Sequence, residues 1–434
     1  MLIIKYTKMK KYNSLSLLCG MLLFVACTDE EAELPSSLSE SGVGEEVSNY
    51  VTLEEALQTA DNVFAQMFPK EVQKRGGVKR KVANVSIVEN RKVIQTRDLS
   101  GGDLSTSLYL VNYADGGGFA LLSSDRRLKP IYAISDEGAL DVSDTVENVP
   151  LKMFFQGVQG DIQMTANAGP SIVTNNPQHN GCKLIVNAQV NPVLWQKVRR
   201  WHQYSPYNAY CFDSNGNPSV VGCAALAIAQ LFSVRSWPTS YDGGHLVWRG
   251  IKNGLNVDML AKLLAKLGEP SLLDIKYGTT ESSAKPANFR RTFMAMGYQD
   301  PGDFHKFSDE EVCEILAGDY GDGKGPILTL AWSGEHATGK GHVWVIDGYA
   351  RFEPETIEEE LELSNKYKIV PYTTLFHCVW GLRGGESNGY YYWGSNNAFD
   401  SSATYDVNDG CDGTVFGEEY VHNIVYMTGF KKQN

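Results

Sequence analysis

The sequence predicts an α+β protein in which a small α+β domain precedes a larger domain built from two lobes. The chain has 434 residues, more than one small domain needs. A helical stripe and several short strand-like runs occupy residues 51–134, whereas after residue 184 helices come first and strands dominate from residue 326. Helices and strands that are segregated in this way are typical of α+β folds.

The first 27 residues have the pattern of a secretory signal peptide. Lysines between residues 5 and 11 form a positive region, and residues 15–26 form an apolar core that is too short to span a bilayer. The end of this leader resembles a bacterial lipoprotein cleavage site, which implies that Cys27 becomes the lipidated first residue; plain secretion is the alternative. We therefore expect a protein that is secreted, or held as a lipoprotein on the outer membrane or cell surface of a Gram-negative bacterium.

The sequence of residues 28–165 predicts a tether that is followed by the small domain. Residues 28–48 are acidic, rich in Glu and Ser and without aromatics, which predicts a disordered tether. In the domain, residues 49–165, Thr52 and Glu55 form a capping-box pattern, and apolar residues at helical spacing continue to Met67. Strand-like runs follow at 82–88, 107–113, 118–123 and 131–134, with a hairpin signal at 115–118.

Residues 166–183 are rich in Asn, Gly and Pro, which predicts an exposed linker where a protease would cut. Residues 184–434 then form the larger predicted domain. Its predicted helices are 258–267, 285–296 and 308–317, and its predicted strands are 326–332, 342–350, 367–380, 389–393 and 424–429. We expect a cleft between the helical half and the sheet half.

Composition and charge exclude several classes of function. The chain is 43% hydrophobic and 21% charged, as in soluble globular proteins, and its net charge of −12 argues against nucleic acid and anionic membrane surfaces as partners. It lacks a P-loop, a dinucleotide-binding glycine fingerprint and zinc-binding spacings, so we expect no metal and no organic cofactor. The acidic run 406–412 fails the EF-hand spacing and favours a polar turn over a calcium loop.

The cysteines do not predict a disulfide framework. Two of the eight, Cys19 and Cys27, lie in the leader, and if Cys223 is a free thiol the remaining five cannot all pair. A chain of this size has enough core to fold without disulfide bonds. We therefore expect no essential disulfide.

Cys223 is the candidate nucleophile. It follows Gly222 at the predicted start of an apolar helix, where unpaired N–H groups and the positive end of the helix dipole favour a thiolate. Gly222 has no side chain, so a substrate backbone can approach closely. Taken alone, a small buried cysteine in an apolar helix is the commoner situation.

His342 and Gln203 are candidate partners of Cys223. His342 begins a predicted strand, and a neighbouring imidazolium would lower the pKa of a thiol. Gln203 lies twenty residues before Cys223, and its amide can donate a hydrogen bond to an oxyanion together with the Cys223 N–H. His336 and His377 are alternative bases, although we expect His377 to be structural.

Five runs of residues, in order over about 195–430, resemble the streptopain family of cysteine peptidases, which have a papain-like fold. The matching runs are Trp201-x-Gln203-x-x-Pro206-Tyr207-Asn208, Gly222-Cys223-x-Ala225-x-Ala227-x-Ala229-Gln230, Tyr277-Gly278 with Ser283-Ala284, Gly341-His342-x-Trp344-Val345-Ile346-Asp347-Gly348, and Trp380-Gly381-x-x-Gly384-Gly385 with Asn388-Gly389-Tyr390.

The resemblance implies a role for each matching residue. Cys223 would be the nucleophile and His342 its proton-transfer partner. Gln203 would help to form the oxyanion hole. The remaining implied site residues are those of the substrate cleft, Ser283, Gly341 and Gly222, and Trp380, which would pack beside the histidine.

Residues 118–128 of the front domain also resemble the prodomain of these peptidases. This implies an intramolecular inhibitor that keeps the enzyme as a latent zymogen acting on protein or peptide substrates. Two positions depart from the family: Val379 stands where the family usually has Asn, and Leu382 with Arg383 replaces a usual second Trp.

The sequence therefore predicts a secreted or surface-anchored cysteine endopeptidase that contacts a membrane only through its lipid anchor. Two alternatives come from other classes. One is a catalytically inactive surface module that binds its partner on the same fold. The other is a transglutaminase-like acyl transferase, which would also pass through a thioester.

Overall fold

The computed structural model describes residues 49–70, 79–89, 92–95, 107–141, 149–167, 182–188, 191, 193–242, 244–318, 323–332, 341–354, 373–382, 385, 387–393 and 423–433. The predictions for the signal peptide with Cys27, the tether at 28–48, His336 and the polar run 406–412 lie outside these residues. Residues from Val47 onward form one compact unit.

The described residues of the N-terminal region, 49–167, form two α-helices, one short 3₁₀ helix and five strands. Its elements are α1 (Leu53–Met67), β1 (Val82–Glu89), β2 (Lys92–Gln95), β3 (Leu108–Tyr113), the short helix η1 (Ala114–Gly116), β4 (Phe119–Ser123), β5 (Ile131–Ser135) and α3 (Val149–Asn167). The predicted capping box is confirmed, because Thr52 Oγ1 accepts a hydrogen bond from the Glu55 N–H and the Glu55 carboxylate accepts one from the Thr52 N–H.

Helix α3 and strand β6 (Cys182–Ala188) were not predicted. Both ends of the predicted linker, 166–183, belong to these elements. Leu151, Phe154, Phe155, Val158 and Ile162 of α3 are buried at helical spacing, and this stripe holds the helix in place in spite of two internal glycines.

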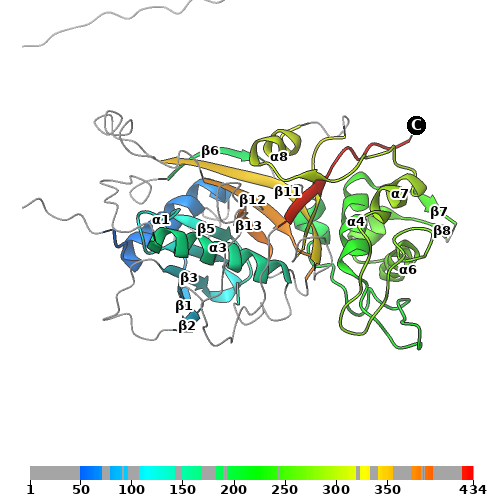
Figure 1. Ribbon diagram of the computed structural model, residues 1–434, viewed down its shortest axis with the longest axis horizontal. Helices are drawn as coiled ribbons and strands as arrows, with labels where there is room; N and C mark the ends of the chain where they lie inside the picture. Colours follow the sequence, from blue (N-terminus) through cyan, green and yellow to red (C-terminus); the bar gives the residue numbers. More distant parts are fainter. Residues whose placement is uncertain are drawn as a thin grey trace, which may run out of the picture. The chain divides into compact units, whose positions relative to one another are not determined.

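The C-terminal region begins at β6, and its described elements after α8 are all strands, in agreement with the predicted dominance of strands from residue 326. Its elements after β6 are the π-helical turn η4 (Leu194–Val198), α4 (Cys223–Arg235), β7 (Ser240–Tyr241), β8 (Gly244–His245), α5 (Trp248–Lys252), α6 (Val257–Leu267), α7 (Asn288–Ala295), β9 (His305–Lys306), α8 (Asp309–Leu316), β10 (Ile327–Trp332), β11 (Gly341–Pro354), β12 (Thr373–Val379), β13 (Gly389–Tyr392) and β14 (Asn423–Met427). Figure 1 shows α4, α6 and α7 as one group, apart from α1 and α3.

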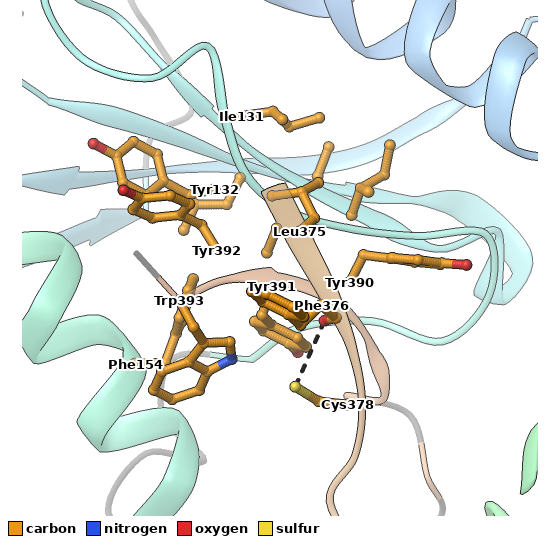
Figure 2. Packing of buried hydrophobic residues seen from close by; sticks show 14 of the residues in the cluster. Ile131, Tyr132, Phe154, Leu375, Phe376, Cys378, Tyr390, Tyr391, Tyr392 and Trp393 are labelled. Atoms are coloured by element: carbon orange, nitrogen blue, oxygen red, sulfur yellow. Dashed lines mark hydrogen bonds between the residues drawn. The ribbon is translucent and has the colours of Figure 1, made fainter. Parts of the chain in front are cut away.

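One antiparallel sheet runs through both regions, in the order β2-β1-β3-β4-β5-β13-β12-β11-β10-β14-β9, with β6 paired to β11. The two regions meet where β5 pairs with β13, with Ile134 opposite Tyr390 and Ala133 opposite Tyr391. Figure 2 shows Tyr132 and Phe154 of the N-terminal region beside the aromatic side chains Tyr391, Tyr392 and Trp393. We call this β5–β13 contact, with the side chains packed on it, the seam.

From Val343 to Ile346 the buried side chains of β11 alternate between two hydrophobic clusters. Val343 and Val345 belong to the cluster that contains α4, α6 and α7, which forms the helical lobe. Trp344 and Ile346 belong to the other cluster, which the C-terminal strands share with the N-terminal region. Successive side chains of a strand point to opposite faces, so the sheet separates the two clusters. The predicted α+β class is confirmed. In the part of the chain that is described, no helix combines the length and apolar character needed to cross a bilayer.

Candidate active site

Cys223 is the first residue of α4, as predicted, and Gly222 caps the helix with a φ of 89°. This positive φ is the reason for a glycine here, because a side chain at such a φ costs about 1–3 kcal/mol of strain. An added Cβ would point at Ser282 and Ile275, at 3.4 and 3.5 Å, and not into open space. The positive φ accounts for a glycine here, and the close approach of a substrate backbone stays a prediction.

Three backbone N–H groups oppose the effect of burial on the pKa of the Cys223 thiol. Burial raises the pKa of this partly buried thiol above its usual value, whereas the N–H groups of Val343, Ala224 and Cys223 itself lower it. Two of the three donors come from the first turn of α4, as a helix N-terminus dictates. The third, Val343, lies on β11 directly after His342. The structure therefore brings Cys223 to the start of the strand that carries His342.

His342 is 5% exposed, and its Nε2 lies 2.9 Å from the main-chain oxygen of Trp380. A carbonyl oxygen only accepts, so Nε2 carries the proton and Nδ1 is left as the basic nitrogen. The ring lies nearly parallel to that of Trp344, with centroids 6.3 Å apart. Burial lowers the pKa of His342 to about 4, in spite of the opposing effect of the Trp380 carbonyl.

Cys223 and His342 are thus a neutral thiol and a neutral imidazole at neutral pH. Among the described residues no hydrogen bond joins them. Trp344, whose ring lies beside the imidazole, and Trp380, whose carbonyl accepts from it, belong to the cluster shared with the N-terminal region, whereas Cys223 packs on the helical lobe. The two groups are neighbours through the Val343 N–H, but they are not ion-paired in the full-length chain.

Gln203 lies beside the segment that leads to Cys223. Its main-chain oxygen accepts a hydrogen bond from the Val221 N–H at 3.0 Å, two residues before the thiol. Because this hydrogen bond lies two residues before Cys223, the half-buried side chain of Gln203 starts from a backbone close to the Cys223 segment.

Ser283 is exposed, and its backbone exchanges two hydrogen bonds with Lys276 at 2.9 and 3.1 Å. The neighbouring Ser282, which the sequence did not single out, makes the contacts to the nucleophile segment. Its hydroxyl donates to the Val220 oxygen at 2.7 Å and accepts from the Gly278 N–H at 3.1 Å. Gly341 is exposed at the first position of β11, opposite Trp332.

Trp380 packs beside the histidine segment, as the resemblance implies. It is 1% exposed, and its ring lies 5.2 Å from that of Trp344. Its indole N–H donates to the Ser387 oxygen at 3.0 Å, and its main-chain N–H donates to Asn388 Oδ1 at 2.9 Å. Val379 is fully buried in the cluster of the helical lobe and offers no polar atom to His342.

His377 is a structural residue, bonded through Nδ1 to Asp347 Oδ1 at 2.5 Å, with both side chains at most 2% exposed. The second oxygen of Asp347 accepts the Asn191 N–H at 3.0 Å. This pair ties β11, β12 and the chain before η4 together. Asp347, near the end of the histidine motif, therefore has a structural role that its place in the motif did not indicate.

Within the described residues no group of three His, Cys, Asp or Glu side chains could hold a metal ion. Cys211, Cys223, Cys313 and Cys378 are free thiols. The site offers a thiol at a helix N-terminus, an imidazole whose Nε2 proton is held by the Trp380 carbonyl, and nearby N–H donors.

Comparison with known proteins gives two family matches. Residues 48–162 match the Spi protease inhibitor family, and residues 201–256 match the Peptidase C10 family. No curated protein is similar enough to match.

Two of the solved structures that resemble the chain come from Prevotella intermedia. A prointerpain A fragment carrying a cysteine-to-alanine substitution is 17% identical, with a TM-score of 0.47, and the match covers 75% of this chain and 96% of that chain. The active wild-type interpain A cysteine protease is 15% identical, with a TM-score of 0.36, and the match covers 60% of this chain and 100% of that chain. The two family matches confirm the resemblance found in the sequence: residues 48–162 are similar to protease inhibitors of the Spi type, and residues 201–256 are similar to cysteine peptidases of the Peptidase C10, or streptopain, family.

Proposed function

We propose that the chain is a cysteine endopeptidase made as a latent zymogen, with Cys223 as the nucleophile and His342 as the general base and acid. The observation that carries this proposal is the meeting of two segments 119 positions apart: the Val343 N–H acts on the Cys223 sulfur, and His342 precedes Val343. The fixed Nε2–H tautomer of His342 supports the same assignment, since it leaves Nδ1 to take the thiol proton.

In the proposed reaction, His342 Nδ1 takes the proton of Cys223 and the thiolate attacks the carbonyl carbon of a peptide bond. The Cys223 N–H and the Gln203 amide hold the oxyanion of the tetrahedral intermediate. His342 then returns the proton to the leaving amine, which leaves a thioester on Cys223. Water, deprotonated by His342, attacks this thioester and releases the carboxylic acid and the thiol.

The prodomain would maintain latency by keeping this pair neutral. Phe154 of α3 lies 4.9 Å from Tyr391 and 5.9 Å from Trp393, ring centroid to ring centroid, and both of these rings contact Trp380. The N-terminal region therefore packs on the aromatic layer that buries His342. Its departure would let water reach the layer, which would raise the pKa of His342 and favour a thiolate–imidazolium pair.

Digestion of casein by the processed protein tests the proposal. We expect hydrolysis by the wild type and at most background activity in Cys223→Ala and His342→Ala, with all three proteins folded to the same thermal stability within a few degrees. Incorporation of a primary amine in excess of hydrolysis would contradict the peptidase proposal and favour an acyl transferase. A processed wild-type protein that binds casein without cutting it would favour a binding module.

We also propose that Cys27 is lipidated and anchors the chain on the outside of the cell. The pattern of the leader supports this. Metabolic labelling with a radioactive fatty acid should mark the wild type and not Cys27→Ser. Label that persists in Cys27→Ser, or no label in either protein, would contradict the anchor and favour plain secretion.

A further inference from the structure

Asn388 uses both ends of its side-chain amide in the interior, where it is 1% exposed. Its Oδ1 accepts the main-chain N–H of Trp380 at 2.9 Å, and its Nδ2 donates to the main-chain oxygen of Arg199 at 3.1 Å. Its own N–H donates to the Gly385 oxygen at 3.2 Å, which holds its backbone. No role was assigned to this residue beyond its place in a sequence motif.

Trp380 needs such a partner because it lies just beyond the end of a strand. The β11–β12 ladder ends with Val345 opposite Val379, so it does not fix the peptide groups of Trp380. The Trp380 N–H donates a hydrogen bond to Asn388 Oδ1, and the Trp380 carbonyl oxygen accepts one from His342 Nε2. The peptide that orients the imidazole is therefore positioned by a side chain eight residues further along.

We propose that Asn388 is the positioning residue for His342: it fixes the Trp380 main chain, whose carbonyl orients the imidazole in place of the amide that Val379 lacks. This inference rests on the proposed peptidase reaction. A neutral amide suits the position, since it must donate to one carbonyl and accept from one N–H at the same time.

Arg199 links this support to the prodomain. Its carbonyl accepts from Asn388, while its guanidinium forms a two-pronged ion pair with Glu137 of the N-terminal region and lies over the Trp195 ring. An added Cβ on Gly385 would come within 2.7 Å of the Arg199 oxygen, so a glycine is needed for this close approach. The same residue thus contacts the inhibitor through its side chain and supports Asn388 through its backbone.

The test compares Asn388→Ala with Ser387→Ala in enzyme obtained by processing of the full chain. Ser387 is a matched control, because only its main-chain oxygen makes hydrogen bonds in the described structure. For Asn388→Ala we expect kcat to fall by about tenfold or more, with little change in KM, since a supporting hydrogen bond pair is lost and not a substrate contact. Ser387→Ala should retain both parameters.

A spectroscopic readout separates positioning from loss of structure. In enzyme labelled with ¹⁵N-histidine, the hydrogen-bonded Nε2 proton of His342 should shift or broaden in Asn388→Ala and stay in place in Ser387→Ala. The signal is assigned by its loss in His342→Gln. An unshifted signal together with an unchanged kcat in folded Asn388→Ala would overturn the inference.

Asn388→Asp is the second variant, and it remains informative if the alanine variant fails to fold. A protonated carboxyl can donate to the Arg199 oxygen and accept the Trp380 N–H as the amide does, whereas a carboxylate cannot donate. The ratio of kcat for Asn388→Asp to that of the wild type should therefore fall as pH rises, following one ionisation. A ratio that does not change with pH would contradict the proposal, and an inactive wild type would instead contradict the peptidase function itself.

Discussion

Gly389→Ala should loosen the prodomain and leave the mature peptidase unharmed. The three heavy atoms nearest an added Cβ all belong to the N-terminal region: the Ile134 oxygen at 2.9 Å, Ser135 Cβ at 2.9 Å and Phe119 Cζ at 3.2 Å. The first contact is with backbone of β5, which cannot move away as a flexible side chain can. Overpacking of this kind costs about 1–3 kcal/mol.

That penalty applies only while the seam is formed. It should weaken the binding of prodomain to peptidase by about 5- to 150-fold, since 1.4 kcal/mol is a factor of ten in a dissociation constant. In the separated peptidase the alanine Cβ makes no contact with the prodomain, and the substitution lowers the conformational entropy of the unfolded chain. The mature form should therefore be as stable as the wild type or slightly more stable.

The assay uses the Cys223→Ala chain with a recognition sequence for an added protease placed between residues 168 and 181. After cutting, the dissociation constant of the two fragments is measured by sedimentation, with and without Gly389→Ala. The catalytic competence of the mature Gly389→Ala enzyme is measured separately on casein. An unchanged dissociation constant would refute the contact between β5 and β13, and equal damage to the mature enzyme would refute its confinement to the seam.

Three further outcomes are expected. Between pH 6.5 and about 4 the unfolded chain protonates His342 whereas the folded chain does not, so the free energy of unfolding should fall by about 3 kcal/mol as the pH drops through this window. Urea unfolding of Cys223→Ala should show this loss, and Cys223→Ala with His342→Gln should show less of it. Parallel profiles of the two variants would contradict the buried imidazole. Gly222→Ala should lower kcat of the mature enzyme, because strain of about 1–3 kcal/mol at φ 89° displaces the Cys223 N–H; a wild-type kcat would contradict this. Phe154→Ala removes a fully buried aromatic side chain and should destabilise the full-length chain by about 3–5 kcal/mol in urea unfolding. The same substitution should leave the mature peptidase unaltered. A full-length chain of wild-type stability would show that α3 is not packed on the seam.

Local chemistry made parts of the fold predictable. The Thr52–Glu55 capping box is a pattern of four adjacent residues, and it forms as predicted. Helix α7 was predicted from residue 285 and begins at Asn288, because Lys285 precedes Pro286 and is disfavoured as helix, so that the first residues form a turn. The sequence of α3 contains apolar residues at helical spacing, but Gly157 and Gly160 disfavour a helix, so the helix was not predicted.

Contacts between distant segments were not predictable in the same way. Nothing in the local sequence indicates that Asn388 bonds to Arg199, 189 positions earlier, or that Arg199 also pairs with Glu137. The family resemblance pointed to the proposed nucleophile, Cys223, and to His342, since both lie in dense motifs. The role of Ser283 in the substrate cleft stays a prediction, and the hydrogen bond from the Ser282 hydroxyl to the Val220 oxygen, 62 positions earlier, had no signal in the local sequence.

The most direct measurement maps the covalent adduct of a peptidyl epoxide on the processed protein by mass spectrometry. The account predicts one adduct per chain, on the sulfur of Cys223, with labelling strongly slowed in His342→Ala and in the unprocessed zymogen. A processed protein that cuts casein while its adduct lies on a different cysteine, or that labels equally fast without His342, would contradict it.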